Sequence, residues 1–460
     1  MSEVHAATAA PPGPNAGLLG FALAGQLRHD PLAAIGRWGR QYGDIAALRL
    51  GPYRGYLINQ PDAIHEILVG TGKQYRKLER GTRILRRAEG NGLVVSSGDF
   101  WRRQRRLIQQ AFQTRRLGRY AELIVEYTLR LAAKWHDGAT LNIADEMTEL
   151  TLLVIARALF DLDLDPSQAA RLRRAVATLS EEFTREFSAP FLLPEWWPTR
   201  GMRRRRWALG VLRRLIWETI HERRAEGIDR GDLLSMLLLA VDEEGDGGGM
   251  SDEQAHAEAL TLFNAGHDST AAALAWTWYL VATHDEVAQR LFDEAHRVLA
   301  GRPATFDDLP QLRYTEWVVK ESLRLYPPTW SLLIREPIEE VELCGYRIPR
   351  GSWLYIFPWV TQRDARYFPD PQRFDPQRFA PERAEDFTAR AYLPFGGGPH
   401  VCIGERFSLM EMTLIVATLV TRWQLRLAED RGPVVPEAHI SIRPRGGLWM
   451  TCHERSPEGA

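Results

Sequence analysis

Cys402 is the residue whose sequence surroundings most clearly indicate chemistry. It lies in the segment Phe395-Gly-Gly-Gly-Pro-His-Val-Cys-Ile-Gly404, ahead of the apolar run from Phe407 to Val420. Glycines let a backbone pass close to a flat or bulky group, and they leave N–H groups to point at an anion. A thiolate is such an anion, and it needs these donors or a metal to stay deprotonated. The segment indicates a reactive or metal-binding cysteine, whereas an isolated cysteine in a glycine-rich turn would ordinarily be structural.

A second constellation lies inside a predicted long helix. Ser251-Asp-Glu-Gln254 has the form of a capping box, and an Ala/Leu-rich stretch follows it. Its middle reads Ala265-Gly-His-Asp268-Ser-Thr270. Glycine in a helix interior costs about 1 kcal/mol relative to alanine, and a buried Asp costs more unless it is paired. The polar interruption predicts a functional site, and the alternative is a solvated stripe on an amphipathic helix.

The segment that begins at Trp101 contains an arginine on its apolar side. Trp101, Arg105, Ile108 and Phe112 fall on one face at helical spacing. Arg105 therefore requires a buried anion. The remaining arginines point outward and form either a solvated face or a docking surface for an acidic electron carrier: Arg102, Arg103 and Arg106.

Glu321 and Arg324 share a predicted helix that stops before Pro327. An i,i+3 pair of this kind is usually a surface ion pair worth a few tenths of a kcal/mol. The pair lies ahead of the cysteine segment in the sequence, with Arg378 in between. This position strengthens an otherwise weak signal.

The elements that must position these residues are mainly helical. Helical periodicity dominates from residue 101 to residue 300, and strand-like alternation surrounds the turn Gly51-Pro52. Short strands are expected between residues 341 and 356, followed by an irregular stretch from residue 361 to 391. We predict a flexible arm over residues 1–16 and, from 17 to 460, a single large, mainly α domain with small β-sheets.

Composition narrows the class of protein. The chain has 460 residues, 45% of them hydrophobic, and a net charge of -1, so nothing global indicates nucleic acid or an anionic membrane. Three widely separated cysteines indicate a reducing compartment such as the cytoplasm, and Cys344 and Cys452 are expected to be packing residues. The apolar stretch Gly17 to Gly25 is shorter than the roughly 20 residues of a membrane anchor.

The spacing Phe-Gly-x-Gly-x-His-x-Cys-x-Gly closely resembles the haem-binding loop of the cytochrome P-450 superfamily, a mainly α fold. The resemblance implies that Cys402 is the axial thiolate ligand of iron in haem b. The other implied cofactor-binding residues are Phe395, Gly398, Gly404, Trp101, Ala265 and Gly266, with His400, Arg105 and Arg335 on the propionates. Gly266 would relax the helix to admit dioxygen.

The interrupted helix resembles the family's distal helix. Asp268 fits the acid position, and Ser269 stands where the family has threonine, with Thr270 as a rival alcohol. By resemblance these residues deliver the protons that dioxygen cleavage consumes. Glu321, Arg324 and Arg378 match a buried structural triad. The implied substrate pocket is apolar and includes Leu262, Phe263, Thr329, Leu332, Leu333 and Ile440.

The resemblance implies a soluble, bacterial-type monooxygenase with the reaction RH + O₂ + 2e⁻ + 2H⁺ → ROH + H₂O. The substrate would be a hydrophobic fatty acid, terpenoid, steroid or polyketide-like molecule. Electrons would come from a separate ferredoxin or flavodoxin-type donor with its reductase. Two alternatives are a peroxide-using or rearranging haem-thiolate enzyme, which often lacks the acid–alcohol pair, and a non-catalytic haem sensor, which needs neither the polar interruption nor a large apolar pocket.

Overall fold

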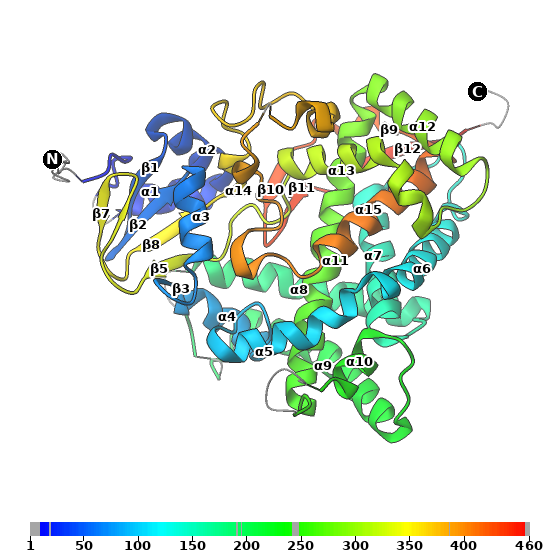
Figure 1. Cartoon of the computed structure of the whole chain (residues 1–460), viewed down its shortest axis with the longest axis horizontal. Coiled ribbons are helices and arrows are strands. Elements are labelled where there is room, and N and C mark those ends of the chain that lie inside the picture. Colours follow the sequence, from blue (N-terminus) through cyan, green and yellow to red (C-terminus); the bar gives the residue numbers. More distant parts are fainter. Residues whose placement is uncertain are drawn as a thin grey trace. The chain divides into compact units, whose positions relative to one another are not determined.

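The computed structural model describes residues 10–17, 20–189, 192–194, 196–241, 248–385 and 387–455, without the side chains of residues 114, 115 and 188 (Figure 1). Helices with small β-sheets make up the described chain, which confirms the predicted mainly α class. Residues 1–9 of the predicted arm lie outside the described residues. The backbone at Pro12 accepts a hydrogen bond from Ala47 N at 2.7 Å, so this part of the arm is held against strand β1 (Ile45–Leu50).

The chain divides into two compact units, each built from several segments. The first contains residues 1–83, 324–374 and 380–402, and the second contains residues 84–323, 375–379 and 403–460. The helices α4 (Glu79–Glu89) and α13 (Arg313–Leu325) each cross a boundary between the two. The domain limit predicted at residue 17 stays a prediction.

The first unit is organised around a five-stranded sheet in the order β1-β2-β8-β5-β3. Its strands after β1 are β2 (Tyr53–Ile58), β3 (Tyr75–Lys77), β5 (Arg335–Pro337) and β8 (Trp353–Ile356). A hairpin of β6 (Val341–Leu343) and β7 (Tyr346–Ile348) is separate. The strands predicted on both sides of Gly51-Pro52 and after residue 341 are confirmed. The helices of this unit are α1 (Phe21–His29), α2 (Pro31–Tyr42), α3 (Pro61–Val69) and α14 (Pro358–Thr361).

The second unit is a helical assembly with two small sheets, β4-β12-β9 and β10-β11. Its helices are α5 (Gly98–Gln109), α6 (Thr114–Ala132), α7 (Ile143–Phe160), α8 (Pro166–Ser188), α9 (Arg200–Glu226), α10 (Leu233–Leu239), α11 (Asp252–Ala282), α12 (Asp285–Leu299) and α15 (Glu405–Val420). Its strands are β4 (Thr140–Asn142), β9 (Trp423–Leu427), β10 (Pro436–Ala438), β11 (Ile442–Pro444) and β12 (Trp449–Glu454). The helical prediction for residues 101–300 is confirmed.

Helix α11 runs through the middle of this unit (Figure 1) and packs along α7. It begins at the predicted cap, where Ser251 Oγ accepts from Gln254 N at 3.2 Å. The reciprocal half of the predicted capping box is not made, because the Gln254 amide donates to Glu258 Oε1 at 2.7 Å. The helix is continuous through Gly266 to Ala282, so the polar residues do not break it.

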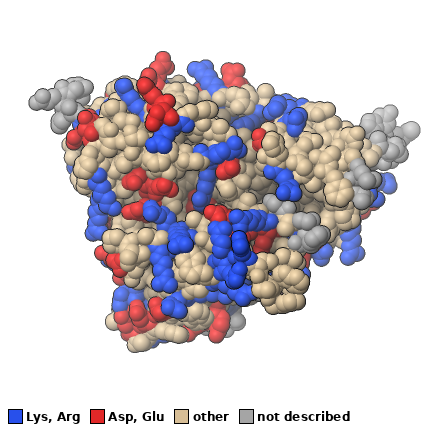
Figure 2. All heavy atoms as spheres, turned by 180° about the vertical axis from the view of Figure 1, so that it is seen from behind, with Lys and Arg blue, Asp and Glu red and all other residues tan. Residues whose placement is uncertain are grey.

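Charge is unevenly distributed over the surface. Figure 2 shows Lys and Arg side chains gathered in the middle of the face that it displays. The densest arginine run in the sequence is residues 203–206 on α9, and three of its four side chains are exposed. Across the described ranges, no helix is both long and apolar enough to span a bilayer.

Candidate functional site

Gly396 and Gly398, both with positive φ angles, shape the loop that carries Cys402. The Cys402 thiol is exposed, and the Cys402 N–H donates to the Phe395 carbonyl at 3.0 Å. Gly398 has a φ of 65°, a region that residues with side chains rarely adopt. A Cβ at Gly398 would lie 2.6 Å from the Leu68 carbonyl oxygen at the end of α3. Only glycine therefore permits this close approach of two backbones.

Arg335 lies beside the same end of α3. Its Nε donates to Thr71 Oγ1 at 3.1 Å, and that hydroxyl donates to the Ile67 carbonyl at 2.9 Å. A second guanidinium nitrogen donates to the Leu333 carbonyl. The first unit thus brings Arg335 and the loop that carries Cys402 to one end of one helix.

The Arg335 guanidinium is a buried cation. Its side chain is 5% exposed, and burial lowers its pKa to about 10. Within the described residues its acceptors are a hydroxyl and a carbonyl, and no carboxylate pairs with it. A buried charge is costly without an anion. A haem propionate is such an anion, so this site fits the cofactor that the resemblance implies.

Helix α5 places Arg105 on the predicted side. Trp101 is buried, Arg105 is half-buried, and its guanidinium carbon lies 5.8 Å from the centre of the Trp101 ring. Arg102 is exposed and pairs with Asp99. The expectation for Arg103 was wrong, because it is half-buried and donates to the carbonyls of Gly248 and Gly249 at 2.9 and 3.0 Å.

One face of α11 is open. Ala265 is exposed and Gly266 and Ser269 are half-buried, although most neighbouring side chains of this helix are buried. Together with Leu262, these residues recur at the spacing i, i+3, i+4, i+7 and share one face. Gly266 also has a packing role that the sequence did not indicate, since a Cβ there would lie 2.8 Å from Ile155 Cδ1 on α7. The exposed stretch thus lies in the middle of a helix whose other side chains are mostly buried.

Asp268 is buried and firmly held. Its Oδ2 accepts from Ser441 Oγ at 2.6 Å, and its Oδ1 forms an ion pair with Arg443 on β11. These two partners offset the cost of burying the carboxylate. No local sequence pattern could have connected Ser441 and Arg443 with Asp268.

The two adjacent alcohols differ in exposure. Ser269 Oγ donates to the Ala265 carbonyl at 2.7 Å, and Thr270 Oγ1 donates to the Gly266 carbonyl at 2.9 Å. Thr270 is 2% exposed, whereas Ser269 is half-buried on the open face. Both oxygens keep lone pairs that can accept a further hydrogen bond.

His267, between Gly266 and Asp268, points into the core. It is buried, its Nδ1 lies 3.0 Å from the Phe263 carbonyl, and burial lowers its pKa to about 4. The imidazole is therefore neutral at physiological pH, with one N–H group.

Glu321 and Arg378 form a buried ion pair in the second unit. Their side chains are 0% and 1% exposed, and Arg378 Nε lies 3.4 Å from Glu321 Oε1. The same carboxylate oxygen accepts from Asp375 N at 3.1 Å. Two members of the predicted triad are thus in direct contact.

Arg324 anchors the irregular stretch of the first unit. Its Nη1 donates to the carbonyls of Gln362 and Pro371, each at 2.8 Å, and its Nη2 donates to the Arg373 carbonyl at 3.1 Å. The Gln362 amide donates to the Arg324 carbonyl at 2.9 Å and accepts from Leu393 N at 2.7 Å. Gln362, which sequence reasoning missed, connects α13 to the residues just before the cysteine loop.

We expect Arg378→Ala to lower the free energy of unfolding by about 3–5 kcal/mol, because Glu321 would be left as an uncompensated buried charge. Arg390→Ala is the control. It removes an ion pair with Asp62 whose side chains are 58% and 71% exposed, and such pairs contribute about 0–1 kcal/mol. Denaturant titration of both variants measures the difference. Equal losses in the two variants would contradict a structural role for the buried pair.

The predicted substrate-pocket residues have different environments. In the first unit Thr329 is exposed and Leu332 and Leu333 are half-buried. In the second unit Leu262 is buried, at 8% exposed, and Ile440 is 39% exposed. The expectation for Phe263 was wrong. It is 1% exposed, and its ring packs against Phe160 and His267 in the core.

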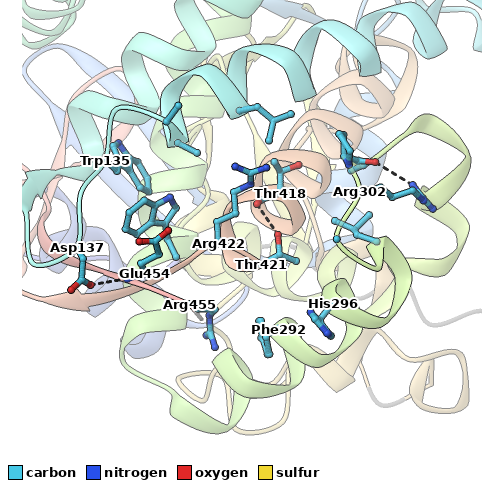
Figure 3. A pocket seen from close by; sticks show the side chains of 18 of the residues that line it. Trp135, Asp137, Phe292, His296, Arg302, Thr418, Thr421, Arg422, Glu454 and Arg455 are labelled. Carbon is cyan, nitrogen blue, oxygen red and sulfur yellow. Dashed lines mark hydrogen bonds between the residues drawn. The ribbon is translucent and has the colours of Figure 1, made fainter. Parts of the chain in front are cut away.

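A cavity of about 580 Å³ lies elsewhere in the second unit, between the ends of α6, α12, α15 and β12 (Figure 3). Its walls include Trp135, Phe292, Thr418, Arg422 and Arg455. None of the residues predicted to carry chemistry lines it. It is therefore a feature separate from the cysteine loop and from the open face of α11.

The other two cysteines behave as packing residues. Cys344 is half-buried and Cys452 is fully buried. Burial raises the pKa of their thiols to about 11 and about 12. Both remain protonated at neutral pH, which leaves Cys402 as the exposed thiol of the described chain.

An exposed cysteine in a glycine-framed loop, a buried arginine without a carboxylate and an open face on a central helix are together typical of haem-thiolate proteins. Comparison with known proteins agrees, since the family model for cytochrome P450 matches residues 11–449.

Similar proteins include the cyclooctat-9-en-7-ol 5-monooxygenase of Streptomyces melanosporofaciens, which is 37% identical over 90% of this chain and 89% of the relative. The cyclooctatin synthase of the same organism is 38% identical over 89% of this chain and 87% of the relative. The pentalenene oxygenase of Streptomyces avermitilis is 34% identical over 90% and 91%.

The chain belongs to the cytochrome P450 family. It is a haem-thiolate monooxygenase, whose cofactor contains iron and whose reaction requires redox partners and a hydrophobic substrate.

Proposed function

We propose that this enzyme inserts one oxygen atom of O₂ into a cyclic terpenoid. Relatives named for oxygenation of cyclooctat-9-en-7-ol and pentalenene support this class over fatty acids, steroids and polyketide-like molecules. Exposed or half-buried apolar side chains at Leu332, Leu333 and Ile440 suit a hydrocarbon skeleton.

The proposed cofactor is haem b, which supplies the binding and reductive activation of dioxygen when present. Cys402 would bind its iron. Arg335, His400 and Arg105 would hold its propionates, with Trp101 beside Arg105. The buried charge of Arg335, which has a hydroxyl and a carbonyl as acceptors, supports this assignment.

Asp268 and Ser269 are proposed to deliver protons at the open face of α11. Ser269 is favoured over Thr270 because it lies on this face, whereas Thr270 is buried. The ion pair with Arg443 and the hydrogen bond from Ser441 hold the Asp268 carboxylate in place. Proton transfer from Asp268 would require this pair to loosen during turnover.

The proposed electron donor is a ferredoxin or flavodoxin-type protein with its reductase, and the proposed location is the cytoplasm. The exposed arginine at residue 102 and its neighbour at 106 on α5 offer a cationic surface for an acidic donor.

The observation that carries the proposal is the presence of Asp268 and Ser269 beside the open face of α11, since peroxide-using relatives often lack this acid–alcohol pair and a haem sensor has no need of it. The test compares product formation driven by NADPH and surrogate redox partners with formation driven by hydrogen peroxide. We expect reductant-driven turnover to dominate. Turnover with peroxide alone would favour the peroxide-using class, and no turnover with either would favour the sensor.

Haem retention tests the propionate assignments. We expect Arg335→Leu, Arg105→Leu and His400→Leu each to lose haem faster than the wild type during transfer to apomyoglobin. The matched control is Arg102→Leu, which alters an exposed residue of the same helix as Arg105. If Arg102→Leu lost haem as fast as the other three, the assignments would be wrong.

A further inference from the structure

Asn264 is a polar residue directly before the exposed Ala265 on α11. Its side chain is half-buried, and its Nδ2 donates to Glu89 Oε1 at 3.0 Å. Within the described part of the chain no group donates to Asn264 Oδ1. The amide is therefore fixed at its nitrogen end, while its acceptor end remains available.

Glu89, at the end of α4, holds this amide from a buried position. It is 7% exposed, and Thr261 Oγ1 on α11 donates to its Oε2 at 3.5 Å. Burial raises the pKa of Glu89 to about 7, against the opposing effect of the hydrogen bonds from Asn264 and Thr261. An ionised carboxylate only accepts hydrogen bonds, so above pH 7 it orients the Asn264 NH₂ group toward itself.

Asn264 directly precedes Ala265, the exposed residue of α11, so its free acceptor lies at the edge of the open face. A substrate that covers Asn264 with a hydrocarbon surface removes water from Oδ1 without replacing its hydrogen bond. An unsatisfied buried acceptor costs about 1–3 kcal/mol, and sites built to bind a hydroxyl discriminate strongly against analogues that lack one.

We propose that Asn264, oriented by Glu89, binds a hydroxyl group that the substrate already carries. The substrate is then a terpenoid alcohol rather than a hydrocarbon or a ketone, because Oδ1 accepts a hydrogen bond and a ketone cannot donate one. This inference rests on the proposed function and narrows its substrate class.

The proposal places the enzyme second in a reaction sequence. An earlier step must introduce the hydroxyl, either by oxygenation of a cyclic hydrocarbon or by a cyclisation that ends with addition of water. The product would then be a diol, with the second oxygen on a carbon held at the cofactor.

The experiment measures binding to the purified holoenzyme at pH 8, where Glu89 is ionised, by the shift of the haem Soret band. The probes are sets that share one carbon skeleton: borneol, camphor and bornane, then cedrol and cedrane, then a library of cyclic alcohols of 10 to 20 carbons with their parent hydrocarbons. We expect alcohols to bind roughly 10-fold or more tightly than their hydrocarbons and ketones, as one satisfied buried hydrogen bond implies.

The variant Asn264→Leu should reduce the preference for alcohols to about threefold or less, since it removes the acceptor and keeps a side chain that branches at Cγ. Glu258→Gln is the matched control. Glu258 is also a buried acid on α11, but it accepts from Leu93 N at 2.8 Å and from the Gln254 amide. The variant Glu258→Gln should leave the preference for alcohols unchanged.

The proposal is overturned if no alcohol in the library binds more tightly than its hydrocarbon, if ketones match alcohols, or if Asn264→Leu keeps the full preference. These outcomes are separable from failure of the proposed function. Reductant-driven oxygenation of any member of the library supports that function whatever its hydroxyl content, and Asn264→Leu should keep the carbon monoxide spectrum of the wild type.

Discussion

Cys402→Ala should abolish the red-shifted Soret band of the reduced carbon monoxide complex and all reductant-driven oxygenation. The band depends on a thiolate ligand, and alanine offers no donor atom. Because Cys402 is exposed, its removal leaves no buried cavity and the fold should persist. Far-UV circular dichroism checks the fold, and the carbon monoxide difference spectrum checks the ligand.

The matched control is Cys344→Ala. Cys344 is half-buried against the Asp44 carbonyl and Gln60, and burial raises the pKa of its thiol, so it should not act as a ligand. This variant should keep the wild-type spectrum. Survival of the red-shifted band in Cys402→Ala would show that another residue binds the iron.

Asp268→Asn should lower the rate of product formation by about 10²–10⁴-fold, which is the usual contribution of a positioned general acid. Asparagine keeps the volume and can still accept from Ser441, so substrate binding should change little. The measurement pairs steady-state turnover with the substrate-induced Soret shift. Asp252→Asn, in the first turn of the same helix, changes a half-buried aspartate that pairs with Arg224 and should retain the wild-type rate.

Coupling distinguishes the two alcohols beside Asp268. Ser269→Ala should divert electrons to hydrogen peroxide, because protons are then no longer directed toward cleavage of the O–O bond. Thr270→Ala should stay coupled. The readout is product formed per NADPH consumed. Full coupling in Ser269→Ala with loss in Thr270→Ala would assign the alcohol role to Thr270. Full coupling in both, together with a wild-type rate in Asp268→Asn, would refute proton delivery by this helix.

The sequence by itself determined features that depend on neighbours along the chain. The glycine loop around Cys402, the cap at Ser251 and the strands around Gly51-Pro52 are local, because a positive φ, an N-cap or a two-residue turn constrains only adjacent residues. Helical periodicity likewise placed Arg105 beside Trp101 and predicted the mainly α class. The motif spacing also predicted the family, which the comparisons confirmed.

The tertiary structure decided which distant groups meet. Asp268 is held by Ser441, 173 residues away. Glu89 reaches Asn264 over 175 residues. Gly266 is explained by the close approach of Ile155, and Phe263 packs in the core rather than on the open face. No local pattern encodes these pairings, because a buried polar group is satisfied by whichever segment the packing of the whole unit brings next to it.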